Sequence, residues 1–169
     1  STMLANGFDL PGVSMGLKEP VLLNDIVGFR RRGADPVAVA ERLSASLDML
    51  ARPFGEDAAV VVKPSNIFNA LAPAALAMRP ESKALLLYAP LPIFLLSVAR
   101  KGLWCRLWCR ELLEGLLRDG IGDLGFEMTD YFRQTDLQIA AVGWLAQQKL
   151  FHEIARKFGP ERIASLDSE

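Results

Sequence analysis

The sequence predicts an α/β protein in which a mostly parallel sheet is flanked by helices on both faces, a three-layer arrangement. Two apolar runs, AAVVVK (58–63) and KALLLYAP (83–90), are short and nearly continuous, which is typical of strands covered on both faces. Amphipathic helical segments alternate with these strands, and such alternation builds βαβ units. Neither a repeat nor a linker interrupts the chain, so we expect a single domain over residues 1–169.

The predicted helices begin and end at recognisable signals. Asp35 is a suitable N-cap and Pro36 fits the first helical position, so the helix that follows them is the clearest one. Ser65 or Asn66 can cap the next helix, and Gly102 is expected to break a long helical segment. In chain order, we expect helical segments within 3–10, 19–33, 34–55, 65–80, 92–120 and 136–159, and strands within 13–17, 58–63, 83–90 and 162–169.

The composition is that of an ordinary globular protein. Of the 169 residues 51% are hydrophobic and 23% are charged, with a formal net charge of −1. This balance argues against a general nucleic-acid binder, which normally carries a basic excess. Pro90 and Pro92 interrupt the longest apolar run, so no membrane span is expected, and the first twenty residues do not resemble a signal peptide. We therefore expect a cytoplasmic protein.

The two cysteines do not indicate a metal site. Cys105 and Cys109 are four residues apart, which places them on one face of a helix. Two thiols are too few for a zinc site unless other ligands converge, and His152 is the only histidine. The sequence therefore predicts two reduced cysteines packed in the interior, and no metal.

The candidate site residues follow the predicted strands. In open α/β sheets, ligands bind at the carboxyl ends of the strands. The first strand ends at Lys18 and Glu19, the second ends at Lys63, and the third leads into a helix that carries Ser97 and Arg100. Lys63 either emerges into solvent or points into a crevice. Glu19 is either a functional carboxylate or only an acidic group that the start of the next helix favours.

The sequence lacks the motifs of two common classes of enzyme. A Walker-type NTPase needs G-x-x-x-x-G-K-[ST], but the sequence has no G-K-[ST], and neither apolar strand ends in Asp. Ser-His-Asp catalysis lacks support because His152 lies within a long helical segment and no G-x-S-x-G is present.

Taken together, the segments at the ends of the predicted strands resemble the motifs of the P-loop sulfotransferase superfamily, especially those of its bacterial sulfotransferase-like members. STML (1–4) resembles the end of the glycine-rich phosphosulfate-binding loop of that family, followed directly by a helix. GLKEP (16–20) resembles its acidic motif, with Glu19 in the position of the catalytic base. The fold that this resemblance implies is a P-loop NTPase/sulfotransferase-like sheet.

Two later segments extend the resemblance. VVVKPSN (60–66) is similar to the apolar strand that ends in lysine, with Ser65 where the cytosolic enzymes carry a catalytic histidine. LLLYAPLPIFLLS (85–97) is similar to the strand and turn that lead to the serine of the 3′-phosphate site, here Ser97. The family's arginine eight residues earlier is replaced by Ala89.

The resemblance implies transfer of a sulfonate group from 3′-phosphoadenylyl sulfate (PAPS), used as a co-substrate, to a hydroxyl or amine of a small-molecule or saccharide acceptor. It implies Glu19 as the base and Lys63 as the cation near the transferring group. It also implies that the 5′-phosphate is held at Ser1 and Thr2, and the 3′-phosphate at Ser97. Arg100 or Lys101, one helical turn from Ser97, can replace the lost arginine.

A second reading from a different class is a catalytically impaired relative that acts as a binding or oligomerising module. Ala89, Ser65 and the absence of a glycine-rich loop before Ser1 favour it. The resemblance implies that a loop and strand precede Ser1 and a further strand follows the last residue, so we expect a chain truncated at both ends. The aromatic side chains suit an acceptor pocket, a packed core or a homodimer face: Trp104, Trp108, Phe126, Tyr131, Phe132 and Trp144.

Overall fold

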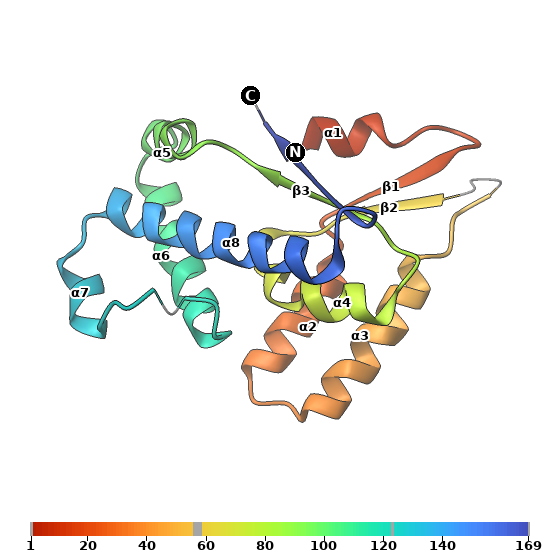
Figure 1. Cartoon of the computed structure of the whole chain (residues 1–169), viewed down its shortest axis with the longest axis horizontal. Coiled ribbons are helices and arrows are strands. Elements are labelled where there is room, and N and C mark those ends of the chain that lie inside the picture. The colour runs from red at the N-terminus through yellow and green to blue at the C-terminus, as the bar shows by residue number, and fades with distance from the viewer. Residues whose placement is uncertain (1, 56–58, 123, 169) are drawn as a thin grey trace. The chain divides into compact units, whose positions relative to one another are not determined.

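The computed structural model describes residues 2–55, 59–122 and 124–168, and it divides into two compact units, Ser1–Pro80 and Glu81–Glu169 (Figure 1). Each unit combines helices with a two-stranded parallel sheet. The α/β class and the parallel pairing are therefore confirmed. The three-layer sheet and the single domain stay predictions.

The first unit contains one strand pair with helices before, between and after its strands. Strand β1 pairs with β2 in parallel, in a register that runs from Ser14 opposite Ala59 to Lys18 opposite Lys63. The elements of this unit are α1 (Thr2–Gly7), β1 (Ser14–Lys18), α2 (Val21–Arg31), α3 (Pro36–Leu50), β2 (Ala59–Lys63), the 3-10 helix η1 (Asn66–Leu71) and α4 (Ala72–Met78).

The core of the first unit lies between α2, α3 and η1. The apolar residues recur at helical spacing on α2 and α3, so each helix turns one stripe toward the interior. The buried residues of this cluster are Leu23, Ile26, Val27, Val39, Leu43, Phe68 and Leu71. Pro73 lies just after the boundary between η1 and α4, where the predicted helix changes from 3-10 to α geometry.

The expected N-cap of α3 is present. The Asp35 carboxylate accepts a hydrogen bond from the backbone N–H of Ala38 at 3.0 Å, and Pro36 occupies the first helical position. We expect Asp35→Ala to lower the free energy of unfolding by about 1 kcal/mol, because one N–H of the first turn loses its partner. Chemical denaturation measures this, with Glu41→Ala on the exposed side of the same helix as the control. Equal effects of the two substitutions would contradict the assignment of the cap.

The second unit contains the other parallel pair. Strand β3 pairs with β4 in a register from Ala84 opposite Ile163 to Tyr88 opposite Asp167. Its elements are β3 (Ala84–Tyr88), α5 (Leu91–Arg100), α6 (Gly102–Arg118), α7 (Met128–Arg133), α8 (Asp136–Phe158) and β4 (Ile163–Asp167). Gly102, at a φ of 74°, separates α5 from α6, which confirms the expected break.

Helices α6 and α8 form the main packing of the second unit. Figure 1 shows α6 crossing α8, and buried side chains of both helices lie in shared clusters. Arg110 of α6 pairs with Asp136 at the start of α8, with 2.7 Å between Nε and Oδ1. The indole N–H of Trp144 donates to the carbonyl oxygen of Ala89 at 2.8 Å, so the segment after β3 is fixed to α8.

The two cysteines are buried and free, as the sequence predicts. Cys105 and Cys109 pack in one cluster with Val98 and Ala140, although the adjacent Trp104 is 72% exposed. Burial is the main cause that raises the pKa of the Cys109 thiol from 9.0 to about 11, and the neighbouring Cys105 contributes in the same direction. The uncharged thiol is therefore the form that the folded protein favours.

This raised pKa makes one contribution to stability depend on pH. The folded chain keeps the Cys109 proton at a pH where the unfolded chain loses it. The contribution is therefore complete below pH 9.0 and is lost as the pH rises through about 11. We expect the wild type to lose more stability over this interval than Cys109→Ala, measured by urea denaturation at a series of pH values. Parallel losses in the two proteins would contradict this expectation.

Two details differ from the sequence prediction. Strands β2 and β3 were expected to be covered on both faces, but their apolar side chains are mostly only half-buried, and Leu85 is 41% exposed. The described helices cover them only in part. Helix α7 was not predicted, because a six-residue helix is too short to show a clear apolar period. Its capping pair, Glu127 and Asp130, was the available signal.

Within the described residues, none of the helices combines the length and the hydrophobicity that a bilayer crossing requires.

Candidate functional site

Two of the predicted site residues come together at the carboxyl edge of the first sheet. Glu19 follows β1 directly and Lys63 ends β2, and the parallel register places Lys63 opposite Lys18. The Lys63 ammonium group forms an ion pair with the Glu19 carboxylate. The backbone N–H of Glu19 also donates to the carbonyl oxygen of Lys63 at 2.7 Å. Residues 44 positions apart in the chain are thus held together by both backbone and side chains.

The backbone at Glu19 has an unusual conformation. Its φ is 44°, and no other described residue except glycine has a positive φ. A non-glycine residue in this left-handed region costs about 1–3 kcal/mol unless its surroundings compensate. The hydrogen bond from its backbone N–H to the carbonyl oxygen of Lys63 holds it there. Such strained residues are frequent at functional sites, so Glu19 is a functional candidate on backbone grounds as well.

The ion pair between Glu19 and Lys63 contributes little to the stability of the fold. The Glu19 side chain is 54% exposed and the Lys63 side chain is 23% exposed, so water and salt reach both groups. An ion pair of this kind contributes about 0–1 kcal/mol. With Lys18 beside them, these three residues carry one excess positive charge at this strand edge. This arrangement suits a site that receives an anion.

The hydroxyl group of Ser65 caps the helix η1. It accepts a hydrogen bond from the backbone N–H of Ile67 at 3.4 Å. This weak bond begins the turn that carries the chain away from Lys63. A serine hydroxyl used in this way is not a general base, so Glu19 is the candidate base among the described residues of this edge.

The other predicted site residues are not placed beside this pair. Ser1 lies outside the described residues, and Thr2 is the first residue of α1, without a described side chain. Ser97 and Arg100 belong to the second unit, where both are exposed on α5. They lie in the last two turns of that helix, where the helix dipole favours cations, so only their side chains are available to hold a phosphate.

Sequence reasoning thus found Glu19 and Lys63 but missed the conformation of Glu19. No local signal indicated it, because a following proline favours extended backbone with a negative φ at the residue before it. The described part of the chain has no cluster of three His, Cys, Asp or Glu side chains that could hold a metal ion.

No protein-family model, curated protein or solved structure matches the chain.

Proposed function

We propose that the chain is a sulfotransferase-family protein that transfers a sulfonate group from PAPS to a hydroxyl or amine of a small-molecule or saccharide acceptor. The observation that carries this proposal is the ion pair between Glu19 and Lys63 at the carboxyl ends of two neighbouring parallel strands. Parallel sheets place their ligands at this edge. A carboxylate and an ammonium group in contact there supply the two functions that the reaction requires.

The proposed step is an in-line displacement at sulfur. The acceptor oxygen or nitrogen forms a bond to sulfur while the bond between sulfur and the bridging phosphate oxygen breaks. Glu19 takes the proton that the acceptor loses, and the leaving group departs as adenosine 3′,5′-bisphosphate (PAP). Lys63 stabilises the negative charge that develops on the bridging oxygen. An ammonium group has three donors, so Lys63 can contact Glu19 and the donor at the same time.

The other predicted site residues are assigned to the two phosphate groups of the donor. Ser1 and Thr2 take the 5′-phosphate, and Ser97 with Arg100 takes the 3′-phosphate. Ser97 and Arg100 are three residues apart on α5, so their side chains lie on neighbouring positions of one helix face. An arginine fork and a hydroxyl are a suitable pair for a phosphate group.

Calorimetric titration of PAP into the natural full-length protein tests donor binding without knowledge of the acceptor. We expect saturable binding, and we expect Ser97→Ala to weaken it by about tenfold, since a hydrogen bond to a charged group is lost. Ser165→Ala removes the same hydroxyl from an exposed position of β4 and is the matched control. Absence of PAP binding by the wild type would overturn the proposal.

A second candidate function is that of a catalytically impaired relative that binds a partner or forms a homodimer. Ala89 favours this candidate, because its side chain cannot bind phosphate and its carbonyl oxygen is bonded to Trp144. Exposed apolar side chains on α6 also favour it, namely Leu103, Trp104 and Leu107. Sedimentation of the wild type and of Trp104→Ser distinguishes the two candidates. A dimer that the substitution dissociates, together with no PAP binding, would support the second.

A further inference from the structure

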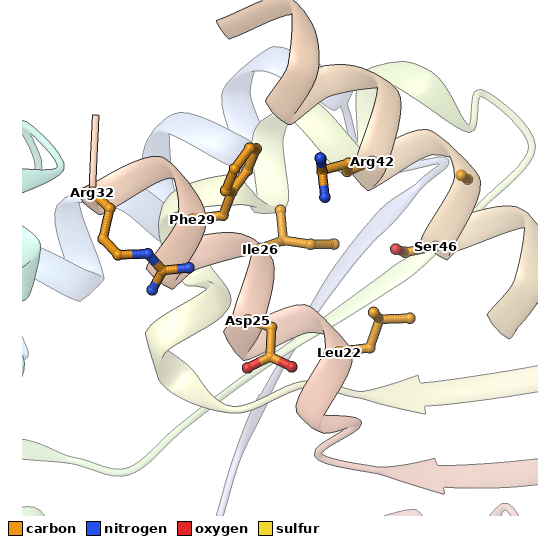
Figure 2. Close-up of a pocket in the computed structure, with 8 residues that line it drawn as sticks. Leu22, Asp25, Ile26, Phe29, Arg32, Arg42 and Ser46 are labelled. Atoms are coloured by element: carbon orange, nitrogen blue, oxygen red, sulfur yellow. The ribbon is translucent and has the colours of Figure 1, made fainter. Parts of the chain in front are cut away.

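We propose that the pocket between α2 and α3 binds a small aromatic carboxylate. The pocket has a volume of about 330 Å³ and lies wholly within the first unit. Figure 2 shows that its lining side chains come from both helices. The proposal does not depend on the sulfotransferase function, because the pocket contains neither Glu19 nor Lys63.

The floor of the pocket is apolar. Leu22, Ile26 and Phe29 recur at helical spacing on α2, so they form one continuous stripe. Ile26 is 4% exposed, and it lies in the middle of the view in Figure 2, between the polar groups of the rim. On α3, the small side chain of Ala45 leaves space opposite this stripe. A flat ring can therefore pack on the half-buried side chains of Leu22 and Phe29, and this contact would remove apolar surface from water.

Arg42 is oriented by the pocket itself. Its guanidinium carbon lies 4.4 Å from the centre of the Phe29 ring, which is a cation–π contact. Among the described residues, no carboxylate forms an ion pair with Arg42, so its donors are available to a ligand. A guanidinium group binds a carboxylate through two parallel hydrogen bonds. The stacking on Phe29 reduces the rotational freedom that such binding must remove.

The remaining polar groups determine the charge and orientation of the ligand. Asp25 of α2 lines the pocket, as does Arg32, which directly follows α2. Ser46 of α3 lies with its hydroxyl oxygen toward Ile26 (Figure 2). Ser46 is buried, with 6% of its surface exposed, so a ligand polar group near it would be shielded from water. Two arginines and one aspartate give a local charge of +1, which favours an anionic ligand over a neutral or cationic one.

The volume limits the size of the ligand. A pocket of about 330 Å³ is at the lower end of the range of small-molecule sites. One or two fused rings with a single carboxylate fill it, with the ring on the apolar floor and the carboxylate at Arg42. Asp25 can accept a hydrogen bond from a hydroxyl group elsewhere on the ring.

An NMR titration of backbone amide shifts on the whole chain tests the proposal with naphthoate as the probe. We expect saturable shifts that cluster on α2 and α3, and no comparable shifts with naphthamide, which has the same shape without the charge. Arg42→Gln should weaken naphthoate binding by about tenfold or more. Arg52→Gln makes the same charge change at an exposed residue outside the pocket and should leave the affinity unchanged.

A second variant fills the pocket without a change of charge. Ala45 is exposed on α3, so Ala45→Leu should be tolerated by the fold and should also weaken naphthoate binding. The proposal is overturned if naphthoate causes no saturable shift, if naphthamide binds equally well, or if Arg42→Gln and Arg52→Gln have equal effects. PAP titration of Arg42→Gln tests the two proposals independently. The substitution lies in the pocket, so the variant should bind PAP with wild-type affinity.

Discussion

Glu19→Gln is expected to lower the rate of sulfonate transfer from PAPS to a phenol acceptor by about 10²–10⁴-fold, the usual contribution of a general base. Glutamine keeps the length of the side chain and an oxygen that can accept a hydrogen bond from Lys63, but it cannot take up the acceptor proton. PAP affinity should therefore change little. The rate is measured as PAP released from PAPS in the presence of the phenol.

The control for this substitution is Glu41→Gln, on the exposed side of α3. It removes the same charge at a distance from the strand edge and should transfer sulfonate at the wild-type rate. If Glu19→Gln also kept the wild-type rate, Glu19 would be only an acidic group near the start of α2, a role that contributes about 0.3–1 kcal/mol to stability. The catalytic role would then be wrong.

Leu43→Ala is expected to have the largest effect on stability among the substitutions considered, a loss of about 2–5 kcal/mol in the free energy of unfolding. Leu43 is 1% exposed and packs in the cluster with Leu23, Val27 and Phe68. Removal of its side chain leaves a cavity between α2 and α3 that rigid helices fill only in part. Far-ultraviolet circular dichroism during urea denaturation measures the loss.

The same variant tests the single-domain prediction. All three tryptophans, Trp104, Trp108 and Trp144, lie in the second unit, so their fluorescence reports the unfolding of that unit alone. If the chain unfolds as one domain, the fluorescence and dichroism midpoints of Leu43→Ala shift together. A fluorescence midpoint that stays at the wild-type value while the dichroism changes would show that the first unit unfolds independently.

Local features of the fold were predictable from the sequence. Asp35 caps α3 and Gly102 separates α5 from α6, because both signals act within a few residues. The short apolar runs that became β2 and β3 were identified for the same reason. The partial cover of these strands was not predictable, since it depends on how distant helices pack and not on the strands themselves.

The candidate site was predictable in its residues but not in its geometry. Lys63 and Glu19 were identified as charged residues at strand exits, and the parallel pairing of β1 with β2 brings them into contact. The left-handed backbone of Glu19 depends on a hydrogen bond to a residue far along the chain, which no local pattern indicates. The pocket beside Arg42 was missed as well, because it depends on how α2 packs against α3.

We propose that the Glu19–Lys63 edge binds and acts on the sulfate donor. The most direct test is calorimetric PAP titration of the charge-swapped double variant Glu19→Lys with Lys63→Glu, in the natural full-length protein. The swap preserves an ion pair, so a purely structural role predicts wild-type PAP affinity. We expect that the wild type binds PAP and that the swap weakens binding by about tenfold or more, because a carboxylate replaces the donor-facing ammonium. Equal affinity of the two proteins, or no binding by the wild type, would contradict it.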